Sequence, residues 1–233
     1  MWRGLLPSAC ALCGAVQRDM VCEDCAAAVL AEVPRCPRCA MARPPGRQCE
    51  ACASWDAAGR TRGPAFDAAF TLGDYATPQD GLILALKFGG ALPLAGWLAS
   101  QLAVRICETV GATARLPDLL VPIPLSPARI ARRGFNQAWE IARPLARHLG
   151  VRTAPALLAR VRDTPAQSAL DLSARRANLR GAFRLARPGR LDGLHIGLVD
   201  DVMTSGVTLH EAARVLKSHG AAHVTAITAL RTP

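Results

Sequence analysis

The sequence predicts an α/β domain with parallel strands, preceded by a small cysteine-rich module. Eight of the nine cysteines lie in the first 52 of 233 residues. Near the C-terminus, an apolar run at 195–201 and another at 223–230 flank a segment of helical periodicity at 207–219. A strand–helix–strand order of this length implies that the two strands pair in parallel. The hydrophobic content of 51% is sufficient to form a core in the C-terminal part.

The N-terminal cysteines form four CxxC pairs. These pairs are Cys10/Cys13, Cys22/Cys25, Cys36/Cys39 and Cys49/Cys52. The two-residue gap lets both thiolates of a pair reach one tetrahedral ion, so eight thiolates predict two structural Zn²⁺ sites. A disulfide framework is the alternative, but such frameworks vary their cysteine spacing, whereas this spacing repeats. Short loops favour two successive ribbons, and an interleaved pairing stays open.

Composition divides the chain into three segments. We expect a double zinc ribbon at residues 1–53, a linker rich in Gly, Pro and polar residues at 54–65, and the α/β domain at 66–233. There is no uninterrupted apolar run of about 18 residues, so no membrane span is expected. Zinc thiolates require reducing conditions, which predicts a cytoplasmic protein.

Hydrophobic periodicity predicts the elements that precede the C-terminal unit. In order, these are a strand at 66–75, helices at 81–88 and 93–110, a strand entering a loop at 119–125, a helix at 138–150, and a long loop or hairpin at 151–194. The helix at 81–88 is dense in apolar residues, including Leu84 and Phe88, and is expected to be buried.

Positive charge is concentrated in the middle of the chain. The net charge is +10, and residues 129–190 hold fourteen arginines against three acidic residues, a local charge of +11. Only two lysines are present, so a compositional bias explains arginine over lysine. That bias does not explain the excess over acids, which predicts an anionic partner: the phosphates of a small ligand, or nucleic acid.

The segment Gly197–Thr208 carries the clearest site. A buried strand ends in Asp200 and Asp201, and a short hydroxyl- and glycine-containing turn then opens a helix. The residues of this turn are Thr204, Ser205, Gly206, Val207 and Thr208. Free N–H groups of a first helical turn form a phosphate cradle, while the two acids suit sugar hydroxyls or a hydrated Mg²⁺. The plainer alternative is an N-cap beside solvated turn acids.

Two substitutions follow from this interpretation. An acid at an open strand end has no buried partner, so Asp201→Asn is expected to leave stability almost unchanged. A side chain at Gly206 is expected to occupy the space where a phosphate meets the backbone.

Three basic residues are candidate contacts for a diphosphate or a nucleic-acid backbone: Lys87, Arg132 and Arg133. The two arginines precede a glycine turn and a helix start, and guanidinium groups suit phosphate oxygens. Lys87 follows an apolar helix, where it either reaches phosphate or lies on the surface. Phe135 either stacks on a base or anchors its helix in the core.

The segment Gly197–Thr208 resembles the phosphoribosyl-diphosphate (PRPP) binding motif of type I phosphoribosyltransferases. That resemblance implies that Asp200 and Asp201 contact the ribose hydroxyls and that residues 204–208 hold the 5′-phosphate. Together with Val121-Pro-Ile-Pro-Leu125, Arg132-Arg-Gly-Phe-Asn-Gln137 and the cysteine module, the chain resembles the ComF family. The fold implied is a double zinc ribbon followed by a type I phosphoribosyltransferase-like parallel sheet with helices on both faces.

The same resemblance implies a role in DNA uptake during natural transformation. The expected partners are single-stranded DNA, PRPP or a related phosphorylated ribose with Mg²⁺, and a DNA-uptake helicase or other competence proteins. Gln167, Arg175 and Arg176 sit where phosphoribosyltransferases carry a closing loop, which makes them candidate phosphate contacts; a solvated basic helix face is the alternative for the two arginines. An active PRPP-dependent transferase with an unknown acceptor is the alternative, although no residue is identifiable as its acid, base or acceptor site.

Overall fold

The structure is a computed structural model, and it describes residues 8–44, 46–47, 49–56, 63–110, 115–162 and 179–233. A parallel sheet of five strands forms the centre of this described part. The strands are, in sheet order, β3 (Ala68–Asp74), β9 (His223–Arg231), β8 (His195–Met203), β4 (Leu119–Pro122) and β5 (Arg152–Thr153). All four neighbouring pairs are parallel, which confirms the predicted strand–helix–strand unit.

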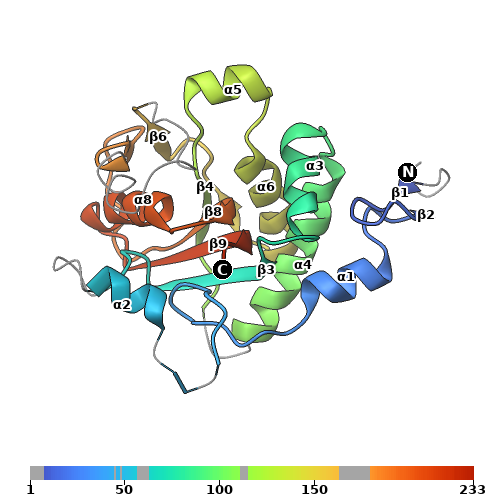
Figure 1. Cartoon of the computed structure of the whole chain (residues 1–233). Helices are drawn as coiled ribbons and strands as arrows, with labels where there is room; N and C mark the ends of the chain where they lie inside the picture. Colours follow the sequence, from blue (N-terminus) through green and yellow to red (C-terminus); the bar gives the residue numbers. More distant parts are fainter. Residues whose placement is uncertain (1–7, 45, 48, 57–62, 111–114, 163–178) are drawn as a thin grey trace.

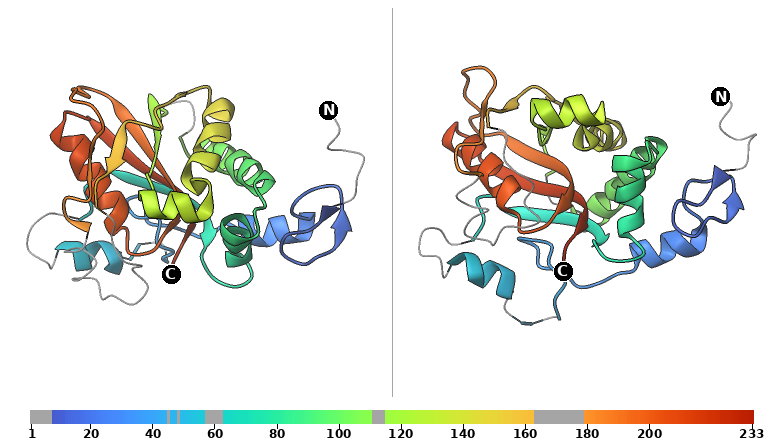
Figure 2. Two further views of the ribbon diagram at one scale, coloured as in Figure 1. Left: turned by 90° about the horizontal axis from the view of Figure 1, so that it is seen from above. Right: turned by 45° about the horizontal axis from the view of Figure 1, so that its top comes forward.

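Helices cover both faces of this sheet, as expected (Figure 1, Figure 2). The helices are α3 (Asp80–Phe88), α4 (Pro93–Val110) and α6 (Gln137–Leu149) on one face, and α8 (Val207–Ser218) on the other. Side chains alternate along β8, so Val199 joins the first apolar cluster while Leu198 joins the cluster under α8. The core therefore lies in two layers with the sheet between them.

A short helix, α5 (Pro127–Arg133), follows β4 where the sequence predicted only a loop. None of its residues is buried, and it stands apart from the sheet at the top of Figure 1. Its apolar content is too low for hydrophobic periodicity to reveal a helix. The region 151–194 contains the expected hairpin, formed by the antiparallel strands β6 (Leu158–Arg160) and β7 (Phe183–Leu185).

The N-terminal module consists of a small antiparallel pair and two helices. These elements are β1 (Ser8–Ala9), β2 (Val16–Gln17), α1 (Glu23–Leu30) and α2 (Glu50–Asp56). α2 continues past residue 53 into the segment expected to be a linker. Within the described ranges, no helix combines the length and apolarity that a membrane crossing requires.

The module and the α/β domain do not have separate cores. Cys10, Val21 and Val29 of the module belong to the same buried cluster as Leu72 of β3 and Leu86 of α3. Ala40, between the third and fourth cysteine pairs, belongs to the other large cluster, under α8. The module therefore packs against the domain at two places.

Candidate functional site

The eight paired cysteines form two separate clusters. Cys10, Cys13, Cys22 and Cys25 make the first, Cys36, Cys39, Cys49 and Cys52 make the second, and all ligand atoms in each lie within 4.8 Å of one another. The Sγ atoms of Cys13 and Cys22 are 3.7 Å apart, and those of Cys39 and Cys49 are 3.5 Å apart. Four sulfurs around one tetrahedral Zn²⁺ lie about 3.8 Å apart. The donor sets fit zinc, with successive rather than interleaved pairing.

Backbone hydrogen bonds favour the thiolate form that a metal requires. Burial alone would raise the pKa of Cys10, but backbone N–H groups, including that of Cys22 at 3.4 Å from the sulfur, lower it to about 6. In the second cluster, hydrogen bonding with Cys52 is the main cause that lowers the pKa of Cys39 to about 5. The lowered pKa of one cysteine in each cluster favours the thiolate form that binds a metal.

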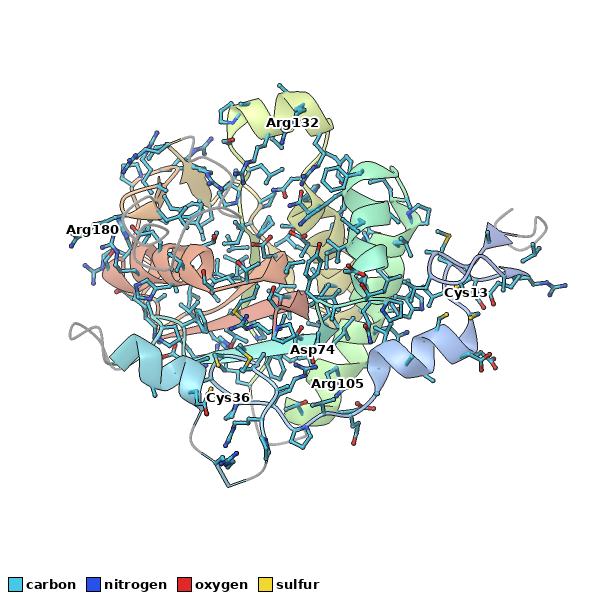
Figure 3. All side chains as sticks on the ribbon, in the orientation of Figure 1. Cys13, Cys36, Asp74, Arg105, Arg132 and Arg180 are labelled. Atoms are coloured by element: carbon cyan, nitrogen blue, oxygen red, sulfur yellow. The ribbon has the colours of Figure 1, made fainter. Side chains whose placement is uncertain are left out.

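The two clusters meet the domain in different ways, and Figure 3 shows Cys13 and Cys36 on opposite sides of the molecule. The first cluster contacts α3 through apolar groups: a side chain at Gly81 would lie 3.2 Å from Leu12. The second cluster is hydrogen bonded to the sheet, because the Ala69 N–H of β3 donates to the Pro37 carbonyl at 2.9 Å. Arg35 pairs with Asp74 at the end of β3 at 2.7 Å.

The turn between β8 and α8 has the form of a phosphate loop. Gly206 caps α8 with a φ of 76°, a left-handed conformation that favours glycine. The Ser205 Oγ is buried and has no hydrogen-bond partner in the described part of the chain. A phosphate oxygen would satisfy that hydroxyl, together with the N–H groups of the first turn of α8.

The expected reason for glycine at position 206 is wrong. A Cβ there would lie 3.5 Å from the sulfur of Met203 and 3.8 Å from Phe66, both ordinary contacts with the core side of the loop. The positive φ therefore explains why glycine occupies position 206. A need for space beside a phosphate does not explain it.

Arg231, the last residue of β9, connects this loop to the second cysteine cluster. Its side chain is only 5% exposed. The Nε donates to the carbonyl of Cys39 at 3.3 Å, and the Nη1 donates to the carbonyl of Met203 at 3.0 Å and to that of Thr204. The buried Arg231 guanidinium therefore hydrogen bonds both to the backbone at the start of the β8–α8 turn and to the backbone of Cys39.

Asp201 is not at an open strand end, because β8 continues to Met203. Its side chain is buried and forms an ion pair with Lys87 of α3, and its Oδ1 accepts a hydrogen bond from the Gln137 amide at 3.1 Å. The expectation that this acid has no buried partner is wrong. Lys87, a candidate phosphate contact, is directed to a carboxylate in this structure.

Asp200 precedes Asp201 on β8, and its Oδ1 accepts a hydrogen bond from the Asp201 N–H at 2.9 Å. Burial raises the pKa of its carboxyl well above the usual range, the charge of Asp201 raises it further, and Lys87 acts in the opposite direction. The two acids therefore differ: Asp201 is paired with Lys87 and Gln137, whereas the pKa of Asp200 is raised.

Arg132 and Arg133, the two candidate arginines of α5, are placed differently. Arg132 is exposed at the top of the molecule (Figure 3). Arg133 donates to the Gln137 Oε1 at 2.6 Å, and its guanidinium lies 5.6 Å from the centre of the Phe88 ring. Gln137 thus joins Arg133 to Asp201. Phe135 packs against the α4–α6 side of the core, as its anchoring alternative predicted.

Comparisons with known proteins agree with this architecture. The sequence matches the double zinc ribbon domain over residues 1–53 and the phosphoribosyl transferase domain over residues 130–233. The chain is 36% identical over 224 residues to the DNA utilization protein YhgH of Salmonella typhimurium, covering 94% of this chain and 95% of that protein. It is 34% identical to competence protein F of Haemophilus influenzae, over 67% of this chain and 69% of that protein. The chain belongs to the ComF family.

Among solved structures, the adenine phosphoribosyltransferase of Leishmania tarentolae aligns with a TM-score of 0.40 at 12% identity, over 74% of this chain and 94% of that one.

Some residues of the candidate site were not predicted from the sequence, and others lie outside the described residues. Gln137 and Arg231 were not singled out, although both bind site residues. Glutamine is common on the surface of helices and arginine at the ends of strands, so the sequence around Gln137 and Arg231 does not indicate that either side chain is buried. Gln167, Arg175 and Arg176 lie in the range 163–178, outside the described residues.

Proposed function

We propose that this ComF family protein binds single-stranded DNA through the basic surface around α5 and retains a pocket for PRPP or a related phosphorylated ribose. The names of its relatives, which concern DNA utilization and competence, support the first part. The matching phosphoribosyl transferase domain supports the second. The observation that carries both is the chain of contacts from Arg133 through Gln137 to Asp201, which joins α5 to the strand end above the phosphate loop.

In this proposal the 5′-phosphate accepts hydrogen bonds from the N–H groups at the start of α8 and from the hydroxyl of Ser205. Mg²⁺ arrives with the diphosphate as part of the ligand. Lys87 neutralises Asp201 while the pocket is empty. The diphosphate then attracts Lys87, which releases the Asp201 carboxylate to the ribose hydroxyls beside Asp200. The lysine thereby alternates between a protein anion and a ligand anion.

The phosphate half of the proposal is tested by calorimetric titration with Mg²⁺-PRPP. Removing a hydrogen bond to a charged group costs about 1.5–3 kcal/mol, so Ser205→Ala should weaken binding roughly 10- to 150-fold. Ser218→Ala is the matched control, because it makes the same change at the other end of α8, where the hydroxyl bonds to the Val215 carbonyl. Equal PRPP affinity for the wild type and Ser205→Ala would show that the loop holds no phosphate.

The DNA half is tested by the salt dependence of oligonucleotide binding. Each phosphate contact contributes about 0.7 to the slope of log affinity against log salt for single strands. Arg132→Gln should reduce affinity and flatten that slope. Arg190→Gln, which removes an exposed arginine before the amino end of β8, changes net charge equally and should leave the slope nearly unchanged. Equal slopes for the two variants would contradict a DNA site at α5.

The same protein samples distinguish a binding module from an enzyme. Release of diphosphate from Mg²⁺-PRPP in the presence of an acceptor would favour the transferase alternative. A cytoplasmic location belongs to the proposal, because eight metal-binding thiolates require reducing conditions.

A further inference from the structure

The most exposed large apolar side chain beside the candidate site is Phe88, at the end of α3. Its exposed fraction is 74%, although the sequence predicted a buried helix here. Leu82, Ile83 and Leu86 of the same helix are fully buried, whereas Leu84, one turn before Phe88, is 43% exposed. α3 therefore presents a narrow apolar stripe away from the core. An exposed aromatic ring costs free energy in water unless something covers it.

The neighbouring helix α5 has an equally open surface. None of its residues is buried, and it contains three arginines and no acid. Partial burial lowers the pKa of Arg133, the charge of Asp201 raises it, and the like charges of Arg129 and Arg132 lower it further. Three cationic side chains on one short helix repel one another, and a polyanion relieves that repulsion.

Phe88 and Arg133 already form a cation–π contact. The guanidinium of Arg133 lies 5.6 Å from the ring centre, and its hydrogen bond to Gln137 holds it there. Gln137 is buried, and its amide is bonded in turn to Asp201. The Arg133 guanidinium is thus held by buried groups beside the exposed ring of Phe88, so the two groups are adjacent before a ligand binds.

We propose that Phe88 and Arg133 form a stacking platform for one base of a single-stranded DNA whose backbone runs along α5. This rests on the proposed function: Phe88 contacts a base of the bound strand, whereas the arginines of α5 contact its phosphates. Aromatic rings stack on bases without regard to sequence, and adjacent arginines hold the backbone. Duplex DNA would not satisfy the platform, because its bases are already stacked. The stacking role weighed for Phe135 belongs to Phe88 instead.

The chemistry of this surface favours a nucleic acid over an apolar protein partner. A protein interface needs a contiguous apolar area with few charges at its centre. Here a guanidinium lies over the aromatic ring, and Arg129 and Arg132 belong to the same helix as that guanidinium. A base accepts a cation on its face and carries phosphate beside it, so the mixed surface suits it.

The test measures anisotropy of a fluorescent thymidine 20-mer and of an abasic strand of the same length, with the full chain. Stacking of one base accounts for a loss of roughly 5- to 150-fold when the ring is removed. We expect Phe88→Leu to weaken binding of the thymidine strand within that range and to leave the abasic strand and the salt slope unchanged. Phe88→Trp should retain affinity, and DNA should quench its added fluorescence. Leu84→Ala is the control for apolar surface on the same helix.

Several outcomes would overturn the platform. In the first, Phe88→Leu and the wild type bind the thymidine strand with equal affinity. In the second, Phe88→Leu loses as much affinity for the abasic strand as for the thymidine strand. In the third, the protein binds free thymidine nucleotide more tightly than the strand, and this binding requires Phe88. The last result would assign the ring to a free nucleotide. If the wild type binds no single-stranded DNA at low salt, the proposed function fails. If the wild type binds with a steep salt slope, and Phe88→Leu binds with the same slope and the same affinity, only the platform fails.

Discussion

The two cysteine clusters both consist of CxxC pairs but contact the domain differently. In the first, Cys13 is exposed, and the cluster contacts α3 through apolar side chains such as Leu12. In the second, three cysteines are buried, and backbone carbonyls of the ribbon accept hydrogen bonds from β3 and β9. Each cluster supports one side of the candidate pocket: α3, which carries Lys87, or β9, which carries Arg231.

The difference teaches that a repeated motif does not imply a repeated role. Apolar contacts are non-directional and tolerate small shifts. The buried guanidinium of Arg231 donates to four carbonyls, so its position depends on direction, and a displacement at one carbonyl moves the others. We therefore expect the second zinc to control the phosphate loop more closely than the first.

The largest effect should separate Cys39→Ser from Cys13→Ser. Each variant should lose one of about two Zn²⁺ per chain in elemental analysis. Apparent binding free energies of structural zinc are about 10–16 kcal/mol, and we expect Cys39→Ser to lose on the order of 5 kcal/mol of unfolding free energy or more. Cys13→Ser should lose less and keep its PRPP affinity. Equal melting temperatures for the two variants would remove the comparison.

The α3 side is tested by its ion pair. Breaking a buried pair by removing one partner costs about 3–5 kcal/mol, and because Lys87 is 20% exposed we expect the lower part of that range for Asp201→Asn and Lys87→Met. Denaturant unfolding measures the loss, and a double-mutant cycle should show that the two effects are not additive. Asp192→Asn, at an exposed pair, is the control and should change little. Additive effects would mean that the pair contributes nothing as a pair.

A smaller loss is expected on the β9 side for Arg231→Met. The change removes the guanidinium donor to the Cys39 carbonyl, at a cost of about 1–3 kcal/mol that the new apolar contact partly offsets, while the Met203 carbonyl keeps the Thr232 N–H as a donor. PRPP affinity should fall along with stability, because the Met203 and Thr204 carbonyls lose their anchor. Arg231→Lys should restore part of both. If the variant loses stability and retains PRPP affinity, the second cluster does not position the loop.

The smallest effect is a change in pH dependence for Asp200→Asn. The pKa of Asp200 is raised in the folded chain, so over the interval above its unfolded value of about 3.9 the folded state binds more protons than the unfolded state. Unfolding free energy therefore falls as pH rises through that interval. The variant should lose this slope and be more stable than the wild type at neutral pH. Parallel stability profiles would show that Asp200 titrates normally.

Local patterns in the sequence were enough for the elements that have strong signals. The four CxxC pairs predicted two metal sites, and both clusters form as expected. Apolar runs predicted the β8–α8–β9 unit, since strands and helices of this length bury regular faces. α5 was not predicted, because a short basic helix has no hydrophobic periodicity. The exposure of Phe88 was not predicted, because it depends on how segments remote in the sequence pack around α3.

The sequence by itself determined the residue types of the site: two acids before a glycine loop, eight thiolates, and an excess of arginine. Only the tertiary structure decided their partners. It gave Asp201 to Lys87, left the Ser205 hydroxyl without a partner in the described chain, and placed Arg231 between the loop and Cys39. The physical reason is that charge and hydrogen-bond capacity belong to a residue, whereas burial and distance depend on how elements remote in sequence pack together.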